Sequence, residues 1–404
     1  MRALDALYAF GVALATSALL TPLAARLARR VGAVDEPRDR GLAREATPLL
    51  GGLAIFAAVA VAGILWLPGS AATRGILGGA ALITLIGALD DVFDLPPQWK
   101  LAGQFVAALV PVAAGVHVDS MTLPFLGVIS LRGFGGVATL IGLVGVMNVV
   151  NLSDGVDGLA AGVGAISAIA FAVIAFDLPH GASAGVLAAL IAGAALGFLI
   201  HNFHPASVFM GDCGSNLLGL LLGCVVVQGT LKTNAVIALV VPLVILAVPF
   251  LDTGFVVAKR IKYRRKFWSA DANHFHHRMA RIGFSQRRTV LYLYAWTVSP
   301  AGLAVALRFG PYSDHHGHFD TGWSLVMIAL GLLALGASVY LVYTLEILKL
   351  RGLRGRQLRK LDPETSEHDI ITAVERDLET GEFEAGGGGS ARVRPPTRRV
   401  DADA

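Results

Sequence analysis

The most unusual stretch of this sequence is an acidic segment between two apolar runs. Asn151-Leu-Ser-Asp154-Gly-Val-Asp157-Gly158 places one amide and two carboxylates between the apolar residues 137–150 and 159–176. Such oxygens suit a hard cation, and the glycines allow a ligand to approach the backbone closely. A tight turn with Asx caps is the structural alternative. Because charge is costly beside lipid, the pattern favours a functional site.

A second acidic cluster, Asp90-Asp91-Val-Phe-Asp94, directly follows an apolar run that ends at Leu89. Three carboxylates this close repel one another unless a cation or bound protons offset their charge. The cluster therefore predicts a metal or general-base site, although a solvated loop with helix-capping aspartates would have the same sequence. Lys100 is expected to pair with this cluster or to bind a phosphate.

Two further polar segments have residue types suited to chemistry. In Val208-Phe-Met-Gly-Asp212-Cys-Gly-Ser215, the aspartate is placed either to supply a carboxylate to Mg²⁺ or to cap the next helix. The basic run 259–266 precedes Asp271-Ala-Asn-His274-Phe-His276-His277-Arg278. That run alone is typical of anionic-lipid contact, and the histidines alone suggest zinc. With no cysteine nearby, they fit phosphate and sugar oxygens better.

The composition indicates an all-α polytopic membrane protein. Of 404 residues, 55% are hydrophobic and only 15% are charged, with a mean hydropathy of +0.65, whereas soluble domains carry about 25% charged residues. The two cysteines are too few for a disulfide framework. The net charge of +4 comes largely from clusters beside apolar runs, so we assign it to membrane topology and expect no nucleic-acid partner.

Apolar runs of membrane-spanning length predict about eleven transmembrane helices, with a small extracytoplasmic hairpin in 117–136. The expected spans are 5–25, 51–67, 75–89, 100–117, 136–150, 159–177, 184–201, 214–231, 235–258, 290–308 and 323–345. They form one transmembrane domain, 1–345. A cytoplasmic tail, 346–404, is expected to be basic, then partly helical, and disordered from about 381.

The basic residues predict the orientation of the chain. If the N-terminus lies outside, 28 of the 33 lysines and arginines fall in the inside segments and the tail, as the positive-inside rule requires. The C-terminus is then cytoplasmic, and all four polar segments lie on the cytoplasmic face. We therefore expect them to form a single site.

Together, the four segments resemble the polyprenyl-phosphate N-acetylhexosamine-1-phosphate transferases, over roughly residues 30–300. The resemblance rests on four motifs: Asp90-Asp91-x-x-Asp94, Asn151-x-x-Asp154-Gly-x-Asp157-Gly-Leu159, Phe209-Met-Gly-Asp212-x-Gly-Ser215 and His274-x-His276-His277-Arg278. It implies Mg²⁺-dependent transfer, with Mn²⁺ as an alternative ion, of a sugar-1-phosphate from a UDP-sugar to a polyprenyl phosphate, releasing UMP. The implied location is the bacterial plasma membrane, and the implied assembly is a homodimer.

The resemblance also implies roles for individual residues. Asp212 is the expected main Mg²⁺ ligand, with Asp154 as a second candidate ligand that is also a candidate for catalysis. Asp90 and Asp91 are the expected catalytic pair near the lipid phosphate, and Asp94 is a further expected catalytic residue. The expected substrate contacts are Lys100, Asn151, Asp157, Phe209, His274, His276, His277 and Arg278.

Asp94 and the His-x-His-His pattern resemble the branch of the family that uses UDP-N-acetylglucosamine. The predicted product is therefore polyprenyl-diphosphate-N-acetylglucosamine, at the first membrane step of a cell-envelope polysaccharide. The sequence departs from the family in its first cytoplasmic loop, where Gly41 and Ala43 replace the usual Lys and His.

Several alternatives remain open. Phospho-MurNAc-pentapeptide transfer, or another UDP-HexNAc specificity, would use the same motifs. An ion-coupled transporter should place its carboxylates near mid-span, whereas here they lie at span ends. A CDP-alcohol phosphatidyltransferase would need further spaced aspartates after Asp157, and the sequence lacks them.

Overall fold

The computed structural model describes residues 3–35, 46–118, 120–123, 127–131, 133–178, 181–229 and 285–310, with scattered positions between 321 and 372. Several predictions lie outside the described residues. They concern the span 235–258, most of the span 323–345 and of the tail, the first-loop positions Gly41 and Ala43, and the segment with His274, His276, His277 and Arg278.

The described chain is predominantly helical. Its helices are α1 Ala3–Val31, α2 Gly51–Trp66, α3 Ala71–Phe93, α4 Pro97–Ala113, α5 Gly135–Ser153, α6 Leu159–Phe176, α7 Ala182–Asn202, α8 Gly211–Gly229 and α12 Gln286–Phe309. Seven of them, all except α2 and α4, are long and apolar enough to cross a membrane. The all-α membrane fold is thereby confirmed. Nine of the eleven predicted spans coincide with a described helix, so the full count of eleven is not confirmed.

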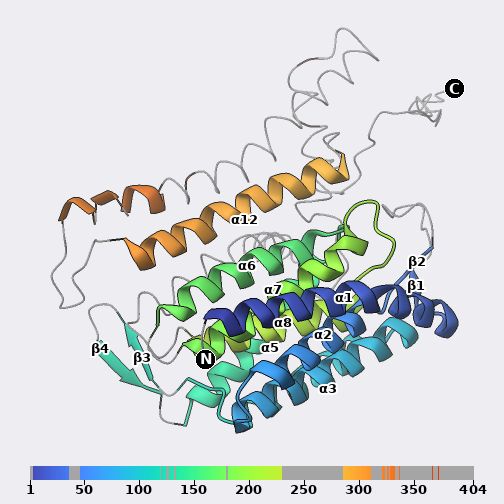
Figure 1. Ribbon diagram of the computed structural model, residues 1–404, viewed down its shortest axis with the longest axis horizontal. Coiled ribbons are helices and arrows are strands. Elements are labelled where there is room, and N and C mark those ends of the chain that lie inside the picture. Colours follow the sequence, from blue (N-terminus) through green and yellow to red (C-terminus); the bar gives the residue numbers. More distant parts are fainter. Residues whose placement is uncertain are drawn as a thin grey trace, which may run out of the picture.

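Two small antiparallel strand pairs lie at opposite ends of the helical bundle (Figure 1). β3 Ser120–Leu123 pairs with β4 Gly127–Ser130 and forms the predicted hairpin. β1 Val34–Asp35 pairs with β2 Thr47–Pro48 at the other end. The side of the membrane on which each pair lies stays a prediction.

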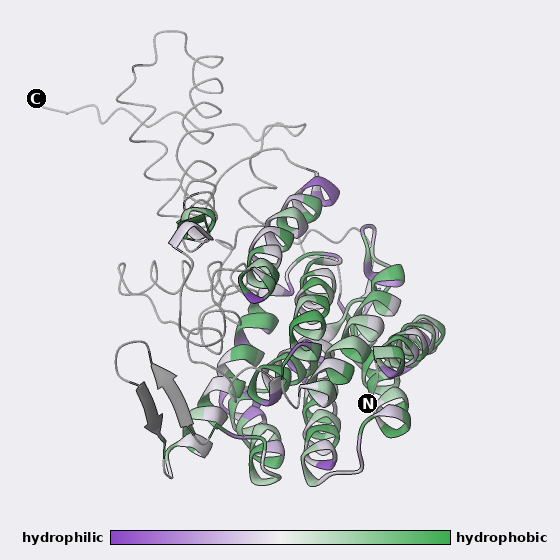
Figure 2. Ribbon diagram, turned by 60° about the vertical axis from the view of Figure 1, so that its left-hand side comes forward, coloured by the Kyte–Doolittle hydropathy of each residue, from purple (hydrophilic) through white to green (hydrophobic). Residues whose placement is uncertain are grey.

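Helices α6, α7 and α8 form the centre of the bundle, because most of their residues are buried. Helix α1 packs on α7 and α2, and α12 packs on α6. The outer helices expose apolar side chains such as Leu19 and Ile64. Hydrophilic colour gathers at helix ends and connections, and the helix bodies are mainly hydrophobic (Figure 2). This distribution fits helices surrounded by lipid.

Glycines bring α2, α3 and α8 into close contact at one end of the bundle. A Cβ atom on Gly52 would lie 2.2 Å from the backbone nitrogen of Gly214, and one on Gly87 would lie 2.4 Å from Cα of Cys213. Small residues allow this approach between helices in lipid. As a result, the C-terminal turn of α3 lies beside the first turn of α8.

Helix α1 contains Pro22, which has no backbone N–H to donate to the carbonyl of Ala18 one turn earlier. The ring nitrogen Nε2 of His201, on α7, lies 2.9 Å from that carbonyl oxygen. The histidine therefore supplies the donor that the proline removes. It has a structural role at the α1–α7 contact.

The structure corrects the expected positions of three site residues. Asp90 and Asp91 were expected after the end of a span at Leu89, but α3 continues to Phe93. Asn151 was expected in a loop, but α5 continues to Ser153. One physical reason is local: the backbone N–H of Leu95 donates to Oδ1 of Asp90 at 2.9 Å, so the carboxylate stabilises the last turn of α3.

Candidate active site at the junction of α3, α4, α5 and α8

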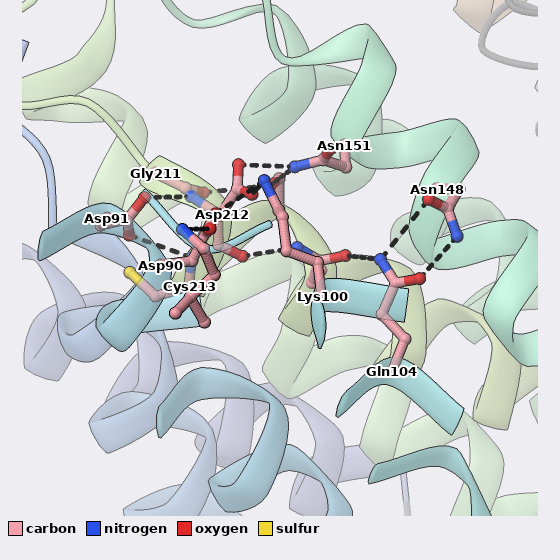
Figure 3. A network of polar contacts seen from close by, with 12 residues as sticks. Asp90, Asp91, Lys100, Gln104, Asn148, Asn151, Gly211, Asp212 and Cys213 are labelled. Atoms are coloured by element: carbon pink, nitrogen blue, oxygen red, sulfur yellow. Dashed lines mark hydrogen bonds and ion pairs between the residues drawn. The ribbon is translucent and has the colours of Figure 1, made fainter. Parts of the chain in front are cut away.

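Lys100 joins carboxylates from two other helices. Its Nζ lies 2.7 Å from Oδ2 of Asp90 on α3, and it also contacts Oδ2 of Asp212 on α8 (Figure 3). The side chains are 33% exposed for Lys100 and 7% for Asp90, so the ion pairs are only partly screened by solvent. The prediction that Lys100 pairs with the acidic cluster is confirmed.

Asp91 makes different contacts from those of Asp90. Its Oδ1 accepts a hydrogen bond from the backbone N–H of Asp212 at 2.7 Å, and its Oδ2 accepts one from Cys213 at 3.2 Å. Both donors belong to the first turn of α8, where N–H groups have no partner within the helix. Asp91 therefore contacts the backbone of α8, and Asp90 contacts a charged side chain.

Asn151 connects α5 to the same end of α8. Its Nδ2 donates to Oδ1 of Asp212 at 2.9 Å and to Oγ of Ser215 at 2.9 Å. The carboxylate of Asp212 is thus held on one oxygen by a neutral amide and on the other by the Lys100 ammonium. Its position in the first turn of α8 is further favoured by the helix dipole.

A triad of amides lies one helical turn deeper, formed by the buried Gln104 on α4, the half-buried Asn148 on α5 and the buried Asn216 on α8. Gln104 Nε2 donates to Oδ1 of Asn216 at 2.8 Å, and Asn148 Nδ2 donates to Oε1 of Gln104 at 2.7 Å (Figure 3). Because a satisfied buried polar network rigidifies its surroundings, the triad links the three helices that carry Lys100, Asn151 and Asp212.

The sequence interpretation missed these amides, although their spacing offered a signal. Gln104 follows Lys100 by four positions, Asn216 follows Asp212 by four, and Asn148 precedes Asn151 by three. Such spacings place residues on one helix face.

The backbone of Gly158, at the end of the segment 154–158 between α5 and α6, is held by neutral donors and acceptors. The backbone N–H of Gly158 donates to Oδ1 of Asn202 at 3.0 Å, and its carbonyl accepts from the hydroxyl of Tyr294 on α12. Asn202, only 2% exposed, also donates to the carbonyl of Val208. These contacts fix the segment against the chain between α7 and α8.

Asp157 also contacts the chain between α7 and α8. Its Oδ2 lies 2.8 Å from Nδ1 of His204 and accepts the backbone N–H of Ala206 at 3.1 Å. His204 is not among the residues that the sequence singled out, yet its partner Asp157 is a candidate substrate contact.

Asp154 is half-buried, and its side chain has no hydrogen-bond or ion-pair partner among the described residues. Burial raises the pKa of its carboxyl to about 8, and the negative charges of Asp212, Asp91 and Asp157 add to the effect. An aspartate in this environment holds a proton near neutral pH unless a cation reaches it.

The remaining predicted residues lie apart from this hydrogen-bonded cluster. Asp94 is exposed at the end of α3 in a left-handed conformation with a φ of 50°. Phe209 is half-buried, and its backbone N–H donates to Pro48 O at 2.8 Å while its carbonyl accepts from Gly51. The chain before α8 is thereby attached to the start of α2.

The donor set at Asp212 fits a magnesium ion. Among the described residues, no group of three or more His, Cys, Asp or Glu side chains is arranged to hold a metal. Mg²⁺, however, commonly takes only one or two carboxylates and completes its shell with water and substrate phosphates. Oδ2 of Asp212 is buried, and apart from the Lys100 ammonium it has no donor in the described part of the chain. A cation is the natural partner for such an oxygen.

A lysine-bridged pair of aspartates thus lies at one end of an apolar helical bundle with seven described helices that could cross a membrane, which is the composition of an integral membrane protein. Residues 73–230, which contain all but the first two residues of α3 and the whole of α4 to α8, match the model of the family described as glycosyl transferase family 4. The match therefore covers all four helices that meet at the site.

Individual relatives agree with that match. The decaprenyl-phosphate N-acetylglucosaminephosphotransferase of Mycolicibacterium smegmatis is 36% identical over 361 residues, which cover 82% of this chain and 86% of the relative. The undecaprenyl-phosphate alpha-N-acetylglucosaminyl 1-phosphate transferase of Yersinia pestis is 31% identical over 321 residues, which cover 77% and 84%. The chain belongs to this family of polyprenyl-phosphate N-acetylglucosamine-1-phosphate transferases.

Proposed function

We propose that this protein transfers N-acetylglucosamine-1-phosphate from UDP-N-acetylglucosamine to a polyprenyl phosphate, giving polyprenyl-diphosphate-N-acetylglucosamine and UMP. The observation that carries the proposal is the meeting of Asp90, Lys100, Asn151 and Asp212, from four helices, at one end of the bundle. The names of the relatives supply the substrate class. The site is proposed to face the cytoplasm at the plasma membrane, with the N-terminus outside and the C-terminus inside.

In the proposed reaction, an oxygen of the lipid phosphate attacks the sugar-bearing phosphorus of the UDP-sugar. A phosphorus–oxygen bond to the lipid forms, and the bond to UMP breaks. Lys100 provides positive charge that stabilises the phosphate oxygens. Asp90 and Asp212 hold its ammonium group in place before the substrate binds. Asp90 accepts the proton of the lipid phosphate when that group arrives protonated.

Mg²⁺, held by Asp212 with the amide of Asn151 or the carboxyl of Asp154 as further candidates, would neutralise charge on the diphosphate. Asp157 and Phe209 are proposed to line the nucleotide pocket. His274, His276, His277 and Arg278 are proposed to contact the sugar and its phosphate, and Asp94 to influence the lipid side. Mn²⁺ is proposed as an alternative ion, and a homodimer as the assembly.

The test is release of UMP by purified protein supplied with Mg²⁺, undecaprenyl or decaprenyl phosphate, and a panel of UDP-sugars. UDP-N-acetylglucosamine should be the best donor. A preference for UDP-MurNAc-pentapeptide would instead support the alternative transfer. Chelation of the metal should abolish release.

Asp212→Asn should lower the rate by more than about 100-fold, because changing even an outer partner of a metal ligand typically costs about 10- to 100-fold. Asp177→Asn is the matched control, since Asp177 pairs with Arg308 just beyond the opposite end of α6. Near-normal, metal-dependent UMP release by Asp212→Asn would contradict the assignment of the metal.

A further inference from the structure

The two adjacent aspartates of α3 have different surroundings. Asp90 directs one oxygen to the Lys100 ammonium and the other to the backbone of Leu95. Asp91 has both oxygens occupied by the N–H groups of Asp212 and Cys213. Figure 3 shows the two carboxylates directed to different partners. Sequence alone treats them as an equivalent pair, but the hydrogen bonds do not.

The first turn of α8 needs a capping group that its own sequence does not supply. Helices leave their first N–H groups without intrahelical partners, and a Ser, Thr, Asp or Asn just before the helix usually accepts one of them. Here α8 begins at Gly211, and the residue before it is Met210, an apolar side chain with 0% exposure. A carboxylate from another helix occupies the place of the missing cap.

Gly211 makes room for that carboxylate. Its φ is +70°, and a Cβ atom at this position would lie 2.4 Å from Oδ2 and 2.9 Å from Oδ1 of Asp91. One turn earlier on α3, Gly87 contacts the backbone of Cys213 in the same close manner. Gly87 and Asp91 therefore form a continuous strip of α3 against the start of α8.

We infer that Asp91 is a positioning residue that caps α8 from α3 and thereby fixes the carboxylate of Asp212, whereas Asp90 faces the reacting groups. The inference rests on the proposed function only in that Asp212 must hold the metal at a defined place. A bond of 2.7 Å to the backbone N–H of Asp212 itself makes this link direct. The negative charge of Asp91 also interacts favourably with the dipole of α8, whose N-terminus carries partial positive charge.

The first experiment measures the cap without any turnover. Amide hydrogen exchange is followed in peptides covering residues 209–216 for the wild type and for Asp91→Asn and Asp91→Ala. We expect fast exchange in Asp91→Ala, and protection closer to wild type in Asp91→Asn, because Asn caps helices about as well as Asp. Unchanged exchange in Asp91→Ala would overturn the inference, whatever the activity of the protein.

The second experiment compares the two aspartates in the UMP-release assay. Asp91→Asn should keep activity within about 10-fold of wild type, because the asparagine retains one acceptor oxygen for the N–H groups of α8. A 10-fold loss corresponds to about 1.4 kcal/mol. Its Mg²⁺ concentration for half-maximal rate should rise, and the shape of its pH–rate profile should not change. Asp90→Asn should lower kcat far more. Equal losses in both variants, with the acidic limb of the profile removed in both, would overturn the positioning role.

Gly211→Ala is an independent variant that removes no carboxyl group from the sequence. It should resemble Asp91→Ala in exchange and in Mg²⁺ dependence, because its methyl group displaces the Asp91 carboxylate. Gly133→Ala is the matched control, since Gly133 has a φ of +75° and open space around it. The control carries the same backbone strain and should leave Mg²⁺ dependence unchanged. A control that also raised the Mg²⁺ requirement would count against the inference.

Discussion

Two sides of the site are held in place by different forces. The acidic side, comprising Asp90, Asp91, Lys100 and Asp212, is joined by ion pairs and by hydrogen bonds to ionisable groups. The loop side, residues 154–158, is held through the backbone of Gly158, by the amide of Asn202 and the hydroxyl of Tyr294. It is also held at Asp157, whose carboxylate contacts the chain between α7 and α8. The acidic side should therefore respond to changes of charge, and the loop side to changes of shape.

This division suits the proposed chemistry. Phosphate charge must be balanced where bonds form and break, and preformed charged groups are effective there because little reorganisation is needed. A nucleotide requires a wall with a defined shape, and neutral hydrogen bonds to the backbone provide one without adding charge. Four substitutions, each compared with a control, test this difference between the two sides.

The largest effect is expected for Lys100→Met, which removes the cation between two carboxylates. We expect kcat to fall by about 100-fold or more, as is typical when one preorganised charge-stabilising donor is lost. Arg308→Met is the control, because it removes a cation from an ion pair with Asp177 at the opposite end of the bundle. If both variants lost activity equally, the loss could not be attributed to the charge of Lys100 at the acidic side.

An intermediate effect is expected for Asn202→Leu. This change leaves the N–H of Gly158 and the carbonyl of Val208 without their partner, and each unsatisfied buried group costs about 1–3 kcal/mol. The KM for the UDP-sugar should rise by about 10-fold or more, with a smaller change in kcat. Tyr294→Phe removes one bond and should show a weaker form of the same effect.

The control for the loop side is Thr297→Val, which removes a buried hydroxyl whose one hydrogen bond among the described residues is to Leu293, also on α12. It should leave the KM unchanged. A fall in kcat at constant KM in Asn202→Leu would mean that the loop side takes part in the chemical step, and the proposed division between the two sides would be lost.

The smallest effect is expected for Asp154→Asn, as a difference in melting temperature from wild type in metal-free buffer. The pKa of Asp154 is raised to about 8 from its ordinary value of 3.8, so between these pH values the folded protein holds a proton that the unfolded chain releases. Stability then falls as pH rises through this window. Asn removes the penalty, so the variant should melt a few degrees above wild type at pH 8 and at the same temperature near pH 4.

Differential scanning fluorimetry in the presence of a chelator measures this difference, with Asp177→Asn as the control. An Asp154→Asn variant that is no more stable than wild type at pH 8 would show that the loop side carries no unfavourable charge.

Much of the site was predictable because its residues are unusual beside apolar runs. The motifs around Asp90, Asn151 and Asp212 were identified from residue type, and the structure joins them. The partners of Gly158 were not predictable, because Asn202 and Tyr294 lie 44 and 136 positions further along the chain. No pattern of neighbouring residues in the sequence predicts such contacts, because they depend on how α6, α7 and α12 pack.

The different roles of Asp90 and Asp91 also could not be predicted from the sequence. Adjacent residues on a helix point about 100° apart, so a pair that looks uniform in sequence necessarily faces two directions. Which direction meets Lys100 and which meets α8 is decided by the close approach of Gly87 to Cys213. The chemistry of the motif could be predicted from its residue types, but the directions of its side chains depend on how the helices pack.

The contact between His201 and the carbonyl of Ala18 has an evolutionary consequence. The imidazole must carry its hydrogen on Nε2 to donate there, and the carbonyl is available because position 22 is proline. If Pro22 were replaced, α1 would supply its own N–H to Ala18 and the histidine would lose its acceptor. Positions 22 and 201 lie far apart in the chain, but we expect them to vary together, because each residue is useful only while the other is present.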